Sequence, residues 1–106
     1  MTVDATIRFE IFDTAGHLVM TLMRDMKFGM SPAVGHRFFP GSFGIAISRR
    51  FGLHFAIDGI EHGAVPSEDE HQPEVHIVVH TKYPHDIVKE DMADLAADGW
   101  RVMDFR

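Results

Sequence analysis

Apolar and polar residues alternate regularly over the first part of the chain. From Val3 to Ile11 every second residue is apolar, which is the pattern of a strand with one buried face. Asp13 and Gly16 then bracket a four-residue connection that suits a hairpin loop built on a type I turn. Folding the chain back across this loop keeps two apolar faces together. The predicted cross-strand pairs are Ile11 with Leu18, Phe9 with Met20, and Ile7 with Leu22.

The return segment, residues 17–28, fits two periodicities. Its even-numbered residues after His17 are apolar except Arg24, as expected of a second strand. The alternative is a helix, whose apolar face would be formed by Leu18, Val19, Leu22, Met23 and Met26. We predict a strand, because Gly16 is a poor helix start and the strand before it is regular.

The middle of the chain is interrupted by Pro and Gly, which break long elements. Residues 32–39 predict a turn followed by a short strand. Residues 45–59, IAISRRFGLHFAIDG, predict a second hairpin with its tip at Arg49–Gly52. A polar loop is expected at residues 61–73. The segment EVHIVVHTK, residues 74–82, predicts a further strand, antiparallel to a strand at residues 53–60.

One amphipathic helix is predicted near the end of the chain. Asp86 suits its N-cap and Gly99 its C-cap. Its apolar stripe is formed by Val88, Met92, Leu95 and Ala96. A final strand is predicted at WRVMDF, residues 100–105. This order of elements predicts a single α+β domain over residues 1–106. We expect a mostly antiparallel sheet, or a small partly open β-barrel, of about five to seven strands with one C-terminal helix before the last strand.

Composition narrows the class of protein. The chain has 106 residues, of which 45% are hydrophobic and 25% charged, as in ordinary globular domains. It has no apolar run long enough to cross a membrane, and its N-terminus lacks the basic and apolar regions of a signal peptide. Without cysteine there are no disulfides and no thiolate ligands. We therefore expect a cytoplasmic protein that does not bind membranes.

Charge is distributed unevenly along the chain. The net charge is −6, with +2 on residues 1–54 and −8 on residues 55–106. From Asp58 to Glu74 there are six acids and no Lys or Arg. This acidity argues against direct nucleic-acid binding, which needs a basic footprint. It favours the steering of a basic protein partner, and an acidic surface that only maintains solubility is the simpler alternative.

Histidines and carboxylates gather on one predicted sheet face. Matching the apolar faces of residues 53–60 and 74–82 places Ile57 opposite Ile77. The pairs that follow are Asp58–His76 and His54–His80, with Cβ atoms about 5 Å apart. Imidazole and carboxylate groups bind Zn²⁺ and related divalent metals, so these four residues form a candidate metal site. Two alternatives remain: an ordinary half-exposed face with a cross-strand ion pair, and histidines that serve acid–base chemistry or a pH switch.

Three surfaces are candidates for protein contacts. They are the predicted hairpin tip, with Arg49, Arg50 and Phe51; the polar loop, with Glu68, Asp69 and Glu70; and the last turns of the helix, at Asp94. Arginine and aromatic residues are typical of interface hot spots, and a hairpin tip is exposed to solvent. An exposed sheet edge would also allow a homodimer.

The sequence contains no nucleotide-binding loop and no other catalytic motif. It therefore favours a small non-catalytic binding or regulatory domain that acts through protein–protein contacts. A regulator, an inhibitor or immunity-type protein, and a subunit of an assembly all fit this description. One concrete version is an inhibitor that occupies the basic groove of a nucleic-acid-binding partner. The alternative is a metal- or histidine-dependent protein that uses His54, Asp58, His76 and His80.

Overall fold

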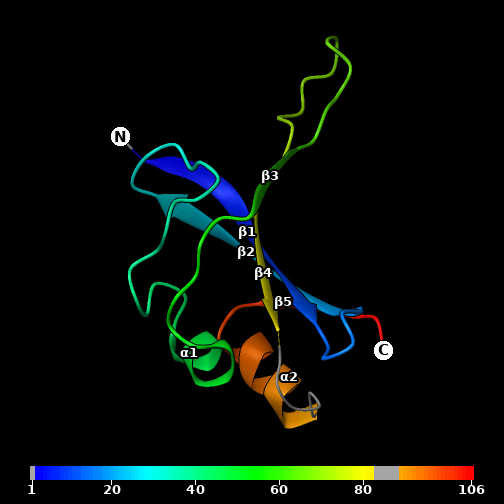
Figure 1. Cartoon of the computed structure of the whole chain (residues 1–106). Helices are drawn as coiled ribbons and strands as arrows, with labels where there is room; N and C mark the ends of the chain where they lie inside the picture. The colour runs from blue at the N-terminus through cyan, green and yellow to red at the C-terminus, as the bar shows by residue number, and fades with distance from the viewer. Residues whose placement is uncertain (1, 83–88) are drawn as a thin grey trace.

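The computed structural model describes residues 2–82 and 89–106, which form one five-stranded sheet and two helices (Figure 1). The strands are β1 (Val3–Phe12), β2 (Leu18–Phe28), β3 (Gly59–His62), β4 (Val75–Lys82) and β5 (Arg101–Asp104). The helices are α1 (Ile45–Phe51) and α2 (Lys89–Ala97). No helix of these residues has the length and apolar character needed to cross a membrane.

The sheet is open and mixed, with strand order β3-β4-β1-β2-β5. β1 lies at its centre, antiparallel to β2 and parallel to β4. The outer pairs, β3–β4 and β2–β5, are antiparallel. The α+β class is confirmed. The expected mostly antiparallel sheet or partly open barrel with one helix is corrected to an open mixed sheet, in which the β1–β4 pairing is parallel, with two helices among the described residues. The connection through α1 leads from β2 to β3, and the loop after β3 then returns the chain as β4, parallel to β1. Side-chain periodicity carries no information on strand direction.

The first hairpin forms as predicted, but in a different register. Residues 18–28 are strand β2, so the helical alternative is wrong. The observed pairs are Ile11 with Met20, Phe9 with Leu22, and Ile7 with Arg24, two residues away from those predicted. The loop is longer than expected because the Asp13 carboxylate accepts from the backbone N–H groups of Ala15 and His17. A shift of two keeps every side chain on its predicted face.

The second predicted hairpin is wrong, because its first strand is helix α1. Gly44 and Gly52 bracket the helix with φ angles of 90° and 93°, which favour glycine. Ala46 and Ile47 are both buried whereas Ile45 is exposed, so the inward positions do not follow a period of two. In an element of only seven residues, tertiary packing outweighs local preference.

The remaining residues of that hairpin pair with an unexpected partner. Phe38 donates its backbone N–H to the carbonyl of Phe55, and Ile57 donates to the carbonyl of His36. An isolated bridge joins Arg37 to Ala56. The short strand predicted within residues 32–39 is therefore an extended segment held against residues 55–57. Of the strand predicted at residues 53–60, only its end is regular, in β3.

The C-terminal helix and the strand after it are present as α2 and β5. Gly99 has a φ of 99° and follows the helix as predicted. Trp100 donates its backbone N–H to the carbonyl of Leu95, and both side chains are buried. Met92 is partly buried, but Ala96 is exposed. The predicted N-cap, Asp86, and the first residue of the stripe, Val88, lie outside the described residues.

The sheet has two unlike faces. On the core face Ile7, Phe9 and Ile11 join one buried cluster with α1 and α2. The ring of Phe9 meets three aromatic rings edge to face, with centroids at 5.0 to 5.5 Å. The opposite face, here called the open face, carries the alternate side chains. Its residues include Thr6, Arg8, Glu10, Thr21, Met23, Asp25, Glu61, His76, Val78, His80 and Arg101.

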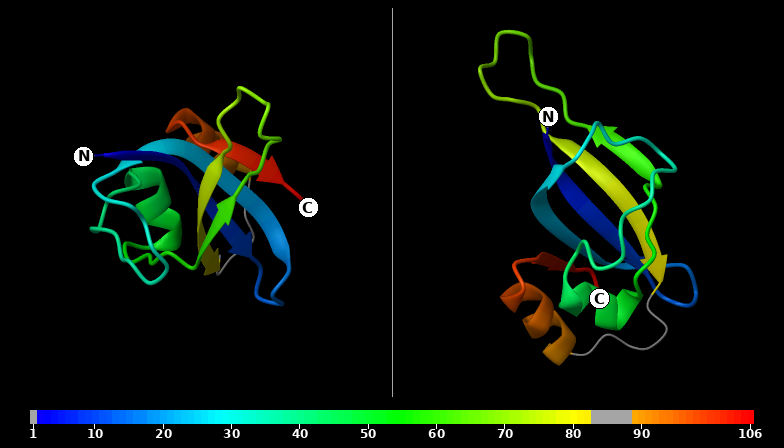
Figure 2. Two further views of the ribbon diagram at one scale, coloured as in Figure 1. Left: turned by 90° about the horizontal axis from the view of Figure 1, so that it is seen from above. Right: turned by 90° about the vertical axis from the view of Figure 1, so that its left-hand side faces the viewer.

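The loop between β3 and β4, residues 63–74, projects well beyond the sheet (Figures 1 and 2). All of its residues are exposed. It carries the acids Glu68, Asp69, Glu70 and Glu74 without any Lys or Arg. A segment with four acids and no Lys or Arg therefore extends into solvent from one end of the sheet.

Candidate functional site

Arg8 lies at the centre of the open face and is only 17% exposed. Its Nη2 donates to Glu10 Oε1 at 2.9 Å and to Glu61 Oε2 at 2.6 Å. Its Nη1 donates to His76 Nδ1 at 3.2 Å. One guanidinium thus links β1, β3 and β4 across this face. Hydrogen bonds between ionised groups are stronger than neutral ones, which favours a fixed position for all four side chains.

His76 connects this network to the β3–β4 loop. Because Arg8 has no acceptor atom, His76 Nδ1 must accept and the ring hydrogen resides on Nε2. That Nε2–H donates to Glu74 Oε2 at 3.3 Å. Glu61 precedes the loop and Glu74 ends it, so both ends of the loop are tied to Arg8.

The predicted pairing of histidines across β3 and β4 is wrong by three residues. Ile60, not Ile57, lies opposite Ile77, and Glu61, not Asp58, lies opposite His76. A shift by an odd number of residues turns the side chains of one strand to the other face of the sheet. The predicted face of histidines and carboxylates therefore does not form. His54 is exposed and lies outside the strands.

Asp58 and His80, which were not predicted to pair with each other, meet through the backbone of His80. Asp58 Oδ2 accepts the backbone N–H of His80 at 2.6 Å, and the Asp58 N–H donates to the carbonyl of Val78 at 2.9 Å. Asp58 thereby forms hydrogen bonds with the edge of β4, immediately before β3 begins. The His80 ring packs edge to face on Phe12, and its Nε2 lies 3.3 Å from Glu10 Oε2.

Across residues 2–82 and 89–106, no three or more His, Asp or Glu side chains are grouped so that they could hold a metal ion. The metal site at His54, Asp58, His76 and His80 remains a prediction without a supporting cluster in this part of the chain.

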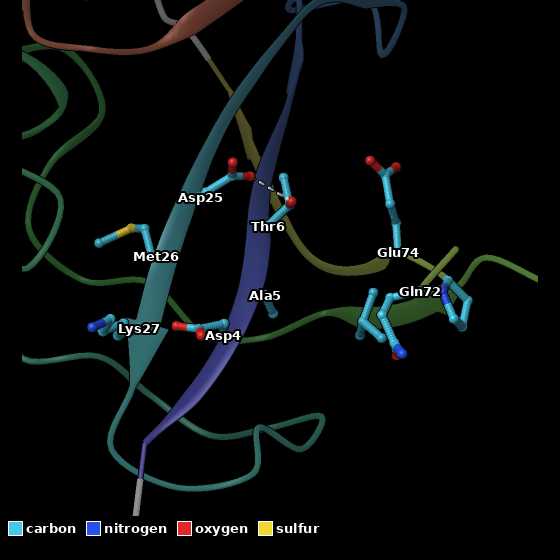
Figure 3. Close-up of a pocket in the computed structure, with 10 residues that line it drawn as sticks. Asp4, Ala5, Thr6, Asp25, Met26, Lys27, Gln72 and Glu74 are labelled. Atoms are coloured by element: carbon cyan, nitrogen blue, oxygen red, sulfur yellow. Dashed lines mark hydrogen bonds between the residues drawn. The ribbon is translucent and has the colours of Figure 1, made fainter. Parts of the chain in front are cut away.

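A groove of about 520 Å³ lies on the open face beside the Arg8 network (Figure 3). Figure 3 shows Gln72 and Glu74 on one side of β1, with Asp25 and Lys27 on β2 at the other side. Asp4 and Thr6 of β1 lie between them. Three segments that are far apart in the sequence therefore bring Asp4, Asp25 and Glu74 to the same groove.

Asp25 is held in place on this groove by two donors. Thr6 Oγ1 donates to its Oδ1 at 2.8 Å, and Arg101 Nη2 donates at 3.2 Å. Both hydrogen bonds favour the ionised carboxylate, that from Arg101 most, and they lower the pKa of Asp25 below its ordinary value. The groove therefore keeps this negative charge even in mild acid.

The predicted hairpin tip at Arg49–Phe51 does not exist, and its residues have separate environments in α1. Arg49 is exposed, whereas Phe51 is partly buried against the core. Arg50 is only 12% exposed and joins the two helices, with Nε at 2.7 Å from Asp91 and Nη2 at 2.6 Å from Asp94. Burial acts to lower the pKa of Arg50, but the hydrogen bonds and charges of Asp91 and Asp94 together outweigh it, and the pKa is raised. Arg50 and Asp94 thus hold α1 against α2.

The predicted acids of the β3–β4 loop are exposed, and two of them have local partners. Asp69 accepts from the backbone N–H and the ring of His71, which lowers its pKa. Ser67 Oγ donates to Glu68 Oε2 at 3.3 Å. In contrast, among the described residues Glu70 has no ion-pair partner.

Sequence reasoning did not identify Asp4, Arg8, Glu10, Asp25 or Glu61 as members of a site. Four of them could have been found, because they occupy the polar alternate positions of the first hairpin, opposite its apolar face. Glu61 could not, since its place beside Arg8 depends on the register of β3.

No protein-family model, curated protein or solved structure matches this chain. The groove offers fixed carboxylates, an amide and exposed backbone, and these groups suit the recognition of positive charge and of hydrogen-bond donors.

Proposed function

We propose that this chain is a non-catalytic binding domain for a positively charged protein partner, in the manner of a regulator or inhibitor. The observation that carries the proposal is the convergence of Asp4, Asp25 and Glu74 on one groove of the open face. The groove is lined by three carboxylates and one cation, Lys27. An excess of negative charge in a groove focuses the electrostatic potential and raises the rate of encounter with opposite charge.

The β3–β4 loop strengthens this potential. It adds Glu68, Asp69 and Glu70 at a position that projects from the same end of the sheet (Figure 2). The groove also has one carboxylate that remains available to a partner. Within residues 2–82 and 89–106, Asp4 has no ion-pair partner. The loop therefore favours long-range attraction, and the groove favours direct contact.

The proposal is tested by titrating the full chain with oligolysine at low and at high salt. We expect binding that weakens steeply with salt, because exposed charges are screened. Asp4→Lys and Glu70→Lys should each weaken binding by about threefold, the size of one surface charge contact. Glu90→Lys, an exposed reversal on α2, is the matched control and should have little effect beyond the change in net charge.

Two results would overturn the proposal. One is binding that does not respond to salt. The other is an equal loss of affinity in the Glu90→Lys control, because net charge alone would then explain the attraction.

A further inference from the structure

We infer that the sheet has a gap beside β1 that accepts an extended peptide segment as an added strand, with cationic and apolar side chains in alternation. The preference for cationic side chains rests on the proposed function. The inference adds the extended shape of the bound segment and the alternation of its side chains.

The first observation is an incomplete ladder. Val3, Asp4 and Ala5 are all paired with β2 on one side. On the other side, the ladder between β1 and β4 begins only at Thr6 and His76. In the part of the chain that is described, these three residues have no strand partner toward β4. The backbone groups of a strand edge are ready to pair with another extended chain.

The reason for the gap is in the sequence. Pro73 stands two residues before β4 and has no backbone N–H to donate to a neighbouring strand. Directly after it, the carbonyl of Glu74 is used on the far side, where it accepts from the N–H of Gly63 at 2.6 Å. Residues 73–74 therefore offer β1 neither an N–H from Pro73 nor the Glu74 carbonyl, and the ladder on β1 begins only at His76.

Two cavities meet at this gap, one on each face of the sheet. The groove of about 520 Å³ lies on the open face. A cavity of about 230 Å³ lies on the core face, and its lining includes Val3, Ile60 and Ile77. Asp4, Ala5 and Val75 line both cavities. Space is thus present on both sides of the position that a new strand would occupy.

The two cavities differ in chemistry. Toward the open face, an added strand would meet three carboxylates, those of Asp4, Asp25 and Glu74, and a single cation, Lys27. Toward the core face it would meet the aliphatic side chains of the smaller cavity. Successive residues of a strand point to opposite faces. The segment that satisfies both cavities therefore alternates Lys or Arg with an aliphatic residue.

The test uses three probe peptides that share the same five side chains. Acetyl-Lys-Val-Lys-Val-Lys-amide has the inferred alternation, and its block isomer acetyl-Lys-Lys-Lys-Val-Val-amide has the same charge without it. An analogue of the first peptide that is N-methylated at every internal amide cannot donate to a ladder from either edge. Binding is followed by two-dimensional NMR of the full chain. We expect the alternating peptide to shift the amide signals of Val3, Asp4 and Ala5. We also expect it to bind about tenfold more tightly than the other two, the effect of one or two net hydrogen bonds.

A pair of protein variants examines the apolar side. Val3→Gln should weaken the alternating peptide and leave the block isomer unchanged, because it places an amide in the smaller cavity. Thr2→Gln, at the exposed neighbouring residue, is the control. Thermal melts of both variants report whether the fold is retained, and the peptide series on the unaltered chain does not depend on them.

The outcomes separate the two proposals. Equal, salt-sensitive binding of all three peptides would overturn the added strand and leave charge recognition standing. Absence of binding by all three would overturn both. Tight binding of the alternating peptide that is insensitive to salt would support the added strand and count against charge recognition.

Discussion

The two faces of β1 are stabilised in different ways although they belong to the same ten residues. On the core face Ile7, Phe9 and Ile11 have no exposed surface, so burial of apolar area stabilises them independently of salt and pH. On the open face Arg8 and Glu10 take part in ion pairs that cross three strands. Ion pairs near a surface weaken with salt and change with protonation. The core face therefore gives the sheet its stability, and the open face can respond to charge.

The largest expected effect is on the core face. Phe9→Ala should lower the free energy of unfolding by about 3–5 kcal/mol, because it removes a fully buried ring from three edge-to-face contacts. Urea unfolding measures this loss, which should be the same at low and high salt. Phe39→Ala is the control: its ring is 89% exposed, and the change should stay within about 0.5 kcal/mol. Equal losses would show that the core is not where the structure puts it.

The next effect concerns the helices that cover the core face. Arg50→Ala should cost about 2 kcal/mol, because it removes two short hydrogen bonds to Asp91 and Asp94 from a largely buried position. Arg49→Ala, the exposed neighbour, should cost less than about 0.5 kcal/mol. Urea unfolding of both variants makes the comparison. Equal losses for the two variants would restore the hairpin-tip interpretation, in which the two arginines are equivalent.

A smaller effect is expected on the open face. Arg8→Met keeps much of the side-chain volume but leaves the carboxylates of Glu10 and Glu61 without their shared cation. We expect a loss of about 1 kcal/mol at low salt that shrinks at high salt. Lys27→Met, an exposed cation on the same groove, is the control and should change stability by less than about 0.5 kcal/mol. A salt-independent loss for Arg8→Met would mean that packing, not charge, fixes this face.

The two faces also differ in how far they could be predicted. The core face of the first hairpin follows from alternation alone, and even a register error of two residues left each side chain on the correct face. The strand β2 and the segment α2–β5 were likewise predictable, because periodicity and the glycine at position 99 agree there.

The open face could not be predicted from the sequence in the same way. It depends on the parallel pairing of β1 with β4 and on a three-residue shift of β3, and neither leaves a mark in local sequence. The helix α1 was missed for a related reason. Its alternating apolar residues resemble a strand, and the contacts that make it helical, such as those of Arg50 with α2, come from residues 41 and 44 positions away.

The smallest expected effect is the pH response of Asp25 on the open face. Its hydrogen bonds with Arg101 and Thr6 lower its pKa in the folded protein below the ordinary value of 3.8. A lowered pKa stabilises the fold above the pKa of the unfolded chain, and this contribution is lost as the pH falls through the folded pKa. Because the side chain is mostly exposed, we expect less than about 0.5 kcal/mol. Asp25→Asn should therefore be slightly less stable than the unaltered chain near neutral pH and equal to it in acid below the folded pKa.

Urea unfolding across this range measures the difference, and Asp4→Asn removes another carboxylate of the groove as the control. A difference between Asp25→Asn and the unaltered chain that persists undiminished in acid would show that Asp25 acts through packing, and the open face would then resemble the core face at this position.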